Sequence, residues 1–102
     1  MIDFTIESDI ENKLIRLVKK LGGRCEKLFN VGCSGFPDRT ILLPNGVIIF
    51  VETKRPKGGR YSPMQDKWRD WLNGLGHHYY RIKDTEQLAT FELVLLDLLA
   101  RK

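Results

Sequence analysis

The chain has 102 residues, of which 42% are hydrophobic and 29% charged, a composition typical of a globular domain and unlike that of a disordered segment. Its net charge of +4 is only mildly basic, so charge alone is a weak sign of nucleic-acid binding. No apolar run approaches the ~18 residues of a membrane span, and the acidic start MIDFTIESDIE lacks the layout of a signal peptide.

These features predict an intracellular, cytoplasmic protein with no role at a membrane, in which Cys25 and Cys33 are reduced. The two cysteines have no matching pair of histidines, so they do not supply the four ligands of a structural zinc site. The length suits one modest core, and we expect residues 1–102 to form a single domain.

The first predicted element is a helix that starts at Ser8 and ends at Gly22-Gly23. Its apolar residues have the spacing of one helical face: Ile10, Leu14, Leu17, Val18 and Leu21. Ser8 and Glu11 fit a capping box at the helix start. The alternating run RCEKLF then predicts a short strand, and NVGCSGFP predicts a loop.

Two strands follow, over residues 38–43 and 47–53, and the second is apolar on both faces, which predicts a central place in a sheet. A second helix runs from its N-cap Ser62 to about Leu75, with Gln65 completing a capping box. HHYYRI predicts a fourth strand. The last helix, over 85–100, has Leu88, Phe91, Leu95 and Leu98 on one face. The order α-β-β-β-α-β-α predicts an α/β fold, a small mixed β-sheet flanked by helices.

The register of the hairpin decides which charged side chains meet. With a two-residue turn Asp38 would lie opposite Thr53, and with a three-residue turn it lies opposite Glu52. Pro44 at the first turn position and Gly46 at the last favour the three-residue turn. We therefore predict that Asp38, Glu52 and Lys54 share one face of the sheet, with directly opposed Cβ atoms ~5 Å apart.

Two adjacent carboxylates repel each other unless a cation lies between them, and a hard divalent ion such as magnesium suits them. Lys54 could then assist deprotonation of an attacking water or stabilise charge that develops on a phosphate. The alternative is a surface salt-bridge cluster of the three side chains, which is common and weakly stabilising.

The segment KRPKGGR, from Lys54 to Arg60, is basic and contains the proline and glycines of a loop. It suits contacts with phosphates, in which Arg55, Lys57 and Arg60 would take part. The alternative is a loop that is simply solvated. Tyr61, next to it, is a weaker candidate for stacking on a base.

The run GFPDR, followed after twelve residues by ETK, resembles the PD-(D/E)xK nuclease motif, with Pro37-Asp38 and Glu52-Thr53-Lys54 as its parts. The wider pattern GxPDR…VxxxVETKRP…GRxSPxQ…W…L…G resembles the VRR-NUC family, the virus-type replication-repair nucleases. The compact length is similar to that of its stand-alone members, which phages often carry. The resemblance runs from the first helix to HHYYRIKD and implies a restriction-endonuclease-like core.

The resemblance implies roles for individual residues. Asp38 and Glu52 are expected to bind the metal, with the backbone carbonyl of Thr53 as a further ligand, and Lys54 to be the catalytic lysine. Gln65 matches the glutamine of the following helix.

Glu11 matches the acidic residue of the first helix, a metal ligand directly or through water, and Glu7 is a rival for that role. Because Glu11 and Gln65 also occupy capping-box positions, helix capping could explain either without catalysis.

The resemblance further implies an endonuclease that uses Mg2+ or Mn2+, needs no small-molecule cofactor, and cleaves branched DNA such as a four-way junction as a homodimer. Arg39 and the basic loop would hold the DNA backbone without reading its sequence. Two alternatives remain: a nuclease fold that binds DNA without cutting it, and a subunit that cuts only with a partner protein.

Overall fold

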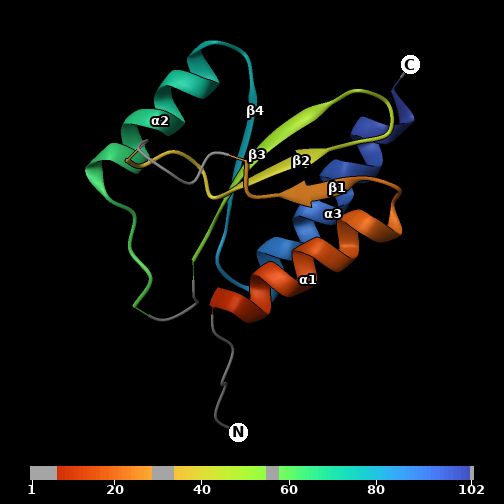
Figure 1. Cartoon of the computed structure of the whole chain (residues 1–102), viewed down its shortest axis with the longest axis horizontal. Helices are drawn as coiled ribbons and strands as arrows, with labels where there is room; N and C mark the ends of the chain where they lie inside the picture. Colours follow the sequence, from red (N-terminus) through yellow and green to blue (C-terminus); the bar gives the residue numbers. More distant parts are fainter. Residues whose placement is uncertain (1–6, 29–33, 55–57, 102) are drawn as a thin grey trace, which may run out of the picture.

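The computed structural model describes residues 7–28, 34–54 and 58–101, with side chains from residue 9 onward, and contains a four-stranded sheet with helices on both faces (Figure 1). The elements follow the order expected from the sequence. They are α1 (Glu7–Lys20), β1 (Arg24–Glu26), β2 (Arg39–Leu42), β3 (Ile48–Thr53), α2 (Pro63–Gly74), β4 (His78–Ile82) and α3 (Thr85–Ala100). None of the helices in these ranges is long and apolar enough to cross a bilayer.

The strands lie in the order β1-β2-β3-β4, which makes β3 central, as its apolar sequence predicts. β1, β2 and β3 pair in antiparallel fashion, whereas β4 pairs with β3 in parallel, so the sheet is mixed. The chain reaches β4 through α2, the kind of crossover that a parallel pair requires.

The main core lies between the sheet and the pair α1 and α3. It contains Ile10, Leu14, Val18, Ile41, Ile49, Val51, Ile82, Leu88, Phe91, Leu95 and Leu98, all buried. Figure 1 shows α1 and α3 on one side of the sheet and α2 on the other. Because side chains alternate along a strand, Ile49 and Val51 face this core while Phe50 and Glu52 face α2. The site is built on the α2 face.

The hairpin between β2 and β3 has the predicted three-residue turn. The backbone N–H of Leu43 donates to the carbonyl of Val47 at 2.9 Å, and the N–H of Gly46 donates to the carbonyl of Leu43 at 3.1 Å. Gly46 has φ +88°, the left-handed conformation that closes such a turn. The pairs from Arg39–Val51 to Leu42–Ile48 have the predicted register, and Asp38 lies one residue before the first of them.

The predicted start of the first helix is wrong. Helix α1 already includes Glu7, so Ser8 lies inside the first turn and is not the N-cap residue. The predicted end is confirmed, since Gly22 has φ +87° and its N–H and that of Gly23 donate to the carbonyls of Lys19 and Val18.

Helix α2 is held against the loop that leads to Asp38. Gly35 has φ +81°, and a Cβ atom built on it would lie 2.6 Å from the backbone carbon of Met64 in the first turn of α2. The indole N–H of Trp68 donates to the carbonyl of Ser34 at 3.2 Å, and its ring packs edge-on against Phe36. The loop and the helix therefore position each other.

The close approach at Gly35 can be tested by Gly35→Ala, with Gly76→Ala as control. Gly76 has a similar φ of +84°, but a Cβ atom added to it would meet nothing within 4 Å. We expect Gly76→Ala to lower the free energy of unfolding by about 1 kcal/mol, the cost of backbone strain alone, and Gly35→Ala to lower it by about 2–4 kcal/mol because Met64 must also move. Urea unfolding measures both, and equal losses would contradict the close contact.

Candidate active site

Three segments converge on the α2 face of the sheet: the residue before β2, the C-terminal end of β3 and the first turn of α2. Arg39 pairs with Val51, Asp38 directly precedes β2, and the charge of Asp38 acts on Glu52 near the end of β3. Gln65, in the first turn of α2, is a hydrogen-bonding side chain close enough to Glu52 to lower its pKa. Residues separated by up to 27 positions in the sequence are thus brought to one point.

Glu52 is the most unusual residue of this group, because its carboxyl group is buried and only partly compensated. The residue is 3% exposed, and its Oε2 atom has no hydrogen-bond partner within the described chain. Burial, together with the charge of Asp38, raises the pKa of Glu52 to about 8, while Lys54, Arg81 and the hydrogen bond with Gln65 act in the opposite direction. A positive charge placed beside Oε2 would relieve this cost.

Asp38 is held in place by the end of β3. The backbone N–H of Thr53 donates to Oδ1 at 3.1 Å and the Thr53 hydroxyl donates to Oδ2 at 2.7 Å. Burial raises the pKa of Asp38, these two hydrogen bonds lower it, and the charge of Glu11 raises it. Each carboxylate oxygen can accept a second partner, so Asp38 is oriented and still able to bind a cation.

Glu11 is near this group, but its carboxylate points to other partners. Its Oε2 accepts from Nε and Nη2 of Arg39 at 3.1 and 2.9 Å, and Nζ of Lys27 lies 3.8 Å away. In the three described ranges, no three Asp, Glu, His or Cys side chains are grouped as ligands of one ion. The structure therefore brings Asp38 and Glu52 close together, whereas the carboxylate of Glu11 is paired with Arg39. The side chain of Glu7 lies outside the described part.

Gln65 has the two roles that its position in the sequence left open. Its Oε1 accepts from the backbone N–H of Ser62 at 2.7 Å, and its own N–H donates to the Ser62 hydroxyl at 3.1 Å, so the predicted capping box is confirmed. The same side chain also lowers the pKa of Glu52. Capping fixes the amide group next to the carboxylate.

The sequence and the fold are similar to those of known proteins. The sequence profile of the VRR-NUC domain matches residues 5–83. A protein described as "Putative nuclease p44", from Acyrthosiphon pisum secondary endosymbiont phage 1, is 40% identical over 84 residues, which cover 82% of this chain and 88% of that protein. A solved structure described as "VRR_NUC domain" superposes with a TM-score of 0.77 at 29% identity, covering 84% of this chain and 92% of the other.

The chain belongs to the VRR-NUC domain family. The matched segment contains every residue discussed above as part of the site and stops before α3, which packs into the core through Leu88, Phe91, Leu95 and Leu98.

In this VRR-NUC domain Asp38 and Glu52 fit a hard divalent cation. Both are carboxylates, the charge of Asp38 acts on Glu52, and the unpartnered Oε2 atom of Glu52 is a buried acceptor without a donor among the described residues. Mg2+ uses one or two carboxylates and keeps several waters, so two carboxylates are enough for it. The Thr53 carbonyl as a third ligand stays a prediction.

Lys54 and Tyr61 border the carboxylates of the VRR-NUC domain. Lys54 follows β3 directly, its backbone N–H donates to the carbonyl of Ile82 at 3.0 Å, and its Nζ atom lies 5.9 Å from the centre of the Tyr61 ring. Arg60 is exposed, whereas Arg55 and Lys57 lie outside the described residues. Arg39 is half-buried and paired with Glu11, and its contact with DNA stays a prediction.

Arg81 is a neighbour of the site that the sequence did not reveal. It lies directly opposite Glu52 on the parallel strand β4 and is one of the charges that lower the pKa of Glu52. Nothing in HHYYRI predicts which residue of β4 pairs with Glu52, because the register of a parallel crossover depends on how α2 packs. The alternation of β4 predicts only that Tyr79 and Arg81 share a face.

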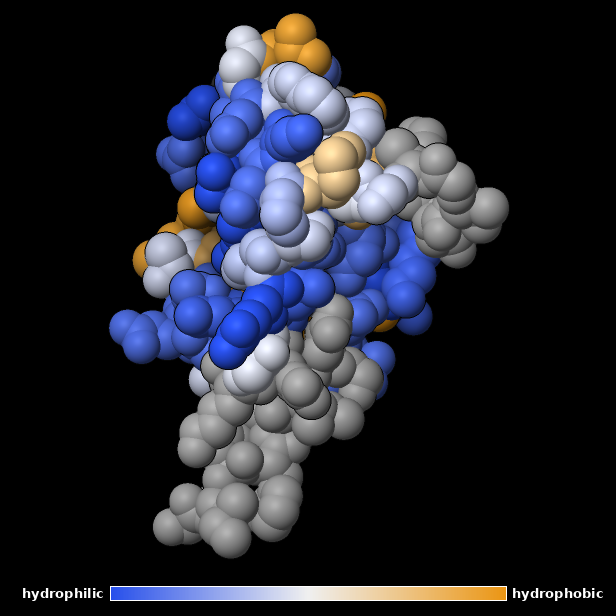
Figure 2. Space-filling view, turned by 90° about the vertical axis from the view of Figure 1, so that its left-hand side faces the viewer, coloured by the Kyte–Doolittle hydropathy of each residue, from blue (hydrophilic) through white to orange (hydrophobic). Residues whose placement is uncertain are grey.

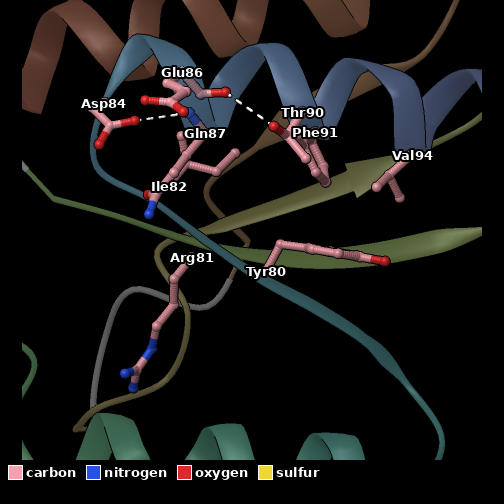
Figure 3. Close-up of a pocket in the computed structure, with 9 residues that line it drawn as sticks. All are labelled: Tyr80, Arg81, Ile82, Asp84, Glu86, Gln87, Thr90, Phe91 and Val94. Atoms are coloured by element: carbon pink, nitrogen blue, oxygen red, sulfur yellow. Dashed lines mark hydrogen bonds between the residues drawn. The ribbon is translucent and has the colours of Figure 1, made fainter.

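A cavity among the described residues lies elsewhere. It has a volume of about 390 Å³ and is formed between β4 and α3, on the opposite face of the sheet from the carboxylates (Figure 3). The side of the molecule that carries α2 is mostly hydrophilic (Figure 2). An open polar surface suits a polyanion, so the carboxylates rather than this cavity mark the candidate active site of the VRR-NUC domain.

The raised pKa of Glu52 predicts a pH-dependent stability. Without metal, folded Glu52 keeps its proton up to about pH 8, while the unfolded group ionises near 4.5, so the free energy of unfolding falls as pH rises from 4.5 to 8. Glu52→Gln, which cannot ionise, should remove most of this fall, on the order of a few kcal/mol. Urea unfolding in EDTA from pH 5 to pH 8 measures it.

The same series with added Mn2+ provides the control. A cation that binds only the folded state should raise the stability of the original protein at pH 8 and leave Glu52→Gln almost unchanged. If the free energy of unfolding of both proteins had the same pH dependence in EDTA, Glu52 would not be the group that causes it.

Proposed function

We propose that this protein is a metal-dependent endonuclease that hydrolyses phosphodiester bonds of DNA. The observation that carries the proposal is the buried, unpartnered Oε2 atom of Glu52, on which the charges of both Asp38 and Lys54 act. Membership of the VRR-NUC family and the name of the phage relative support nuclease activity.

Different residues of the chain would bind the cation, transfer the proton and position the phosphate. Asp38 and Glu52 would hold the cation, with Thr53 orienting Asp38 through its N–H and hydroxyl. Lys54, on the same face as Glu52, would take up a proton from the attacking water or stabilise negative charge on the phosphate. Gln65 would hold Glu52 in place and present the N-terminal end of α2, where anions are favoured, to the phosphate.

A bound divalent cation supplies a Lewis acid that polarises a phosphate oxygen and lowers the pKa of water. Mg2+ and Mn2+ both fit a site of oxygen ligands. Glu11 would serve as a further ligand, directly or through water, and it would also hold Arg39 and add negative charge beside Asp38.

The DNA backbone would cross the polar α2 side of the molecule. The basic loop follows Lys54 and carries Arg55, Lys57 and Arg60, and its charges would contact phosphates without reading bases. Tyr61 would stack on a base only with the face of its ring that is not covered by Arg81. Since a similar protein comes from a phage, we expect such an enzyme to act inside a cell.

We further propose that the substrate is branched DNA and that the active form is a homodimer. The support is the family resemblance together with symmetry, since a two-fold dimer presents two identical sites to two equivalent strands of a four-way junction. Exposed apolar side chains are available on both candidate helices, Trp71 (50% exposed) and Leu75 (75%) at α2, and Leu93 (67%) and Leu96 (46%) on α3.

The catalytic assignment predicts that Asp38→Asn and Lys54→Ala abolish cleavage while leaving the fold and DNA binding largely intact. Each removes a charged group that the proposed reaction needs, so we expect losses of at least ~100-fold. The exposed residue Lys19 on α1 provides the control, and Lys19→Ala should cleave like the original protein. Nicking assays with Mg2+, Mn2+ and EDTA measure the rates.

These assays also separate the alternatives. Binding of DNA without metal-dependent cutting by the purified protein would indicate a binding module or a partner-dependent subunit. A wild-type rate in either Asp38→Asn or Lys54→Ala would refute the assignment of the site.

The substrate proposal predicts that the protein sediments as a dimer at micromolar concentration and cuts a four-way junction faster than linear duplex of the same sequence, by at least tenfold. Analytical ultracentrifugation and cleavage of the two substrates measure these properties. A strictly monomeric protein, or equal rates on both substrates, would contradict this proposal and leave the nuclease assignment standing.

A further inference from the structure

Arg81 connects strand β4 to both sides of the first turn of α2. Its Nε atom donates to the hydroxyl of Tyr79 at 2.9 Å, its Nη2 atom donates to Oδ1 of Asp66 at 2.7 Å, and its guanidinium carbon lies 3.8 Å from the centre of the Tyr61 ring. Its side chain is 19% exposed. Figure 3 shows it directed toward α2, away from the residues of α3.

The two partners outside β4 bracket the segment that carries Gln65. Tyr61 immediately precedes the N-cap Ser62, and Asp66 immediately follows Gln65. In the described part of the chain, Asp66 accepts a hydrogen bond from one strand residue, Arg81, and this bond links the first turn of α2 to the sheet. Arg81 itself stands opposite Glu52 in the parallel pairing. One guanidinium group therefore ties the strand beside Glu52 to both flanks of the turn whose glutamine contacts Glu52.

We propose that Arg81 is a positioning residue: it holds the first turn of α2 through Tyr61 and Asp66 and so keeps Gln65 against Glu52. The inference rests on the proposed function, because it assigns to Arg81 a part in the same reaction. It goes beyond the residues that the motif supplies, none of which is on β4.

The chemistry of arginine suits this role better than that of lysine. A guanidinium group donates hydrogen bonds in its plane, here to Tyr79 and Asp66, while its flat face stacks on an aromatic ring, here Tyr61. A lysine could keep the ion pair with Asp66 but not the stacking or the second in-plane bond. Positioning rather than charge alone therefore requires arginine.

The test compares Arg81→Met with Arg69→Met. Arg69 is a matched control because its Nη1 atom also approaches Asp66, at 3.6 Å, but it lies on α2 itself, 39% exposed, and its hydrogen bond is to Asp70. We expect Arg81→Met to lower kcat of DNA cleavage about 10- to 100-fold, the effect of a misplaced catalytic group, with KM changed less than threefold. Arg69→Met should stay within twofold of the original protein.

Two more variants keep the test decisive if Arg81→Met folds poorly. Arg81→Lys keeps the positive charge beside Glu52 and should recover only part of kcat. Asp66→Asn weakens the link to the turn without changing the sheet and should lower kcat about threefold or more. A wild-type kcat in Arg81→Lys would show that charge alone matters and would overturn the proposal.

Hydrogen exchange of the first turn of α2 provides a readout that needs no activity. The N–H groups of Gln65 and Asp66 donate to Ser62, so they report whether the turn is held. We expect them to exchange at least fivefold faster in Arg81→Met and Asp66→Asn, with the N–H of Leu75 at the far end of the helix unchanged.

The outcomes separate failure of this inference from failure of the proposed function. Unchanged exchange at Gln65 and Asp66 in Arg81→Met overturns the inference, whatever happens to cleavage. A salt slope of DNA binding reduced by about one unit would mark Arg81 as a phosphate contact instead and would also overturn it. If the original protein does not cleave DNA with any metal, the proposed function fails, and exchange still decides whether Arg81 holds the turn.

Discussion

The site depends on a three-residue turn, Pro44-Asn45-Gly46, because that turn sets the register of the hairpin. With Gly46 in the left-handed conformation, Leu43 bonds to Val47 and the pairs follow up to Arg39 opposite Val51, which leaves Asp38 directly before β2 and close enough for its charge to act on Glu52. A register shifted by one residue would move Asp38 to the other face of the sheet. The geometry of a surface turn thus determines whether two carboxylates, 14 positions apart in the sequence, meet at all.

Two buried carboxyl groups that lie close together lower the stability of the folded protein when both are ionised. Glu52 is 3% exposed, and burial together with the charge of Asp38 raises its pKa to about 8. The surroundings offset part of this cost through Lys54, Arg81 and Gln65, while Thr53 binds Asp38. One buried oxygen remains without a donor in the described part of the chain, which is the feature expected of a site completed by a cation. Helix α2, held by Gly35 on one side and Arg81 on the other, closes the arrangement.

Much of this could be predicted from local sequence. The helices, the capping box of Ser62 and Gln65, the central position of β3 and the hairpin register follow from periodicity and turn chemistry, which act over a few residues. The start of α1 could not be predicted, since Ser8 fits a capping box although the helix begins earlier. The pairing of Arg39 with Glu11 and of Arg81 with Glu52 depends on how distant elements pack, and no local pattern encodes it.

The central claim is that Asp38 and Glu52 hold one divalent cation between them. Anomalous diffraction from crystals soaked in Mn2+ tests it most directly, because manganese scatters anomalously and replaces magnesium at oxygen sites. The account predicts a single strong peak bound by oxygens of both Asp38 and Glu52, which disappears in crystals of Glu52→Gln. A peak that avoids these two carboxylates, or no peak at millimolar Mn2+, would contradict it.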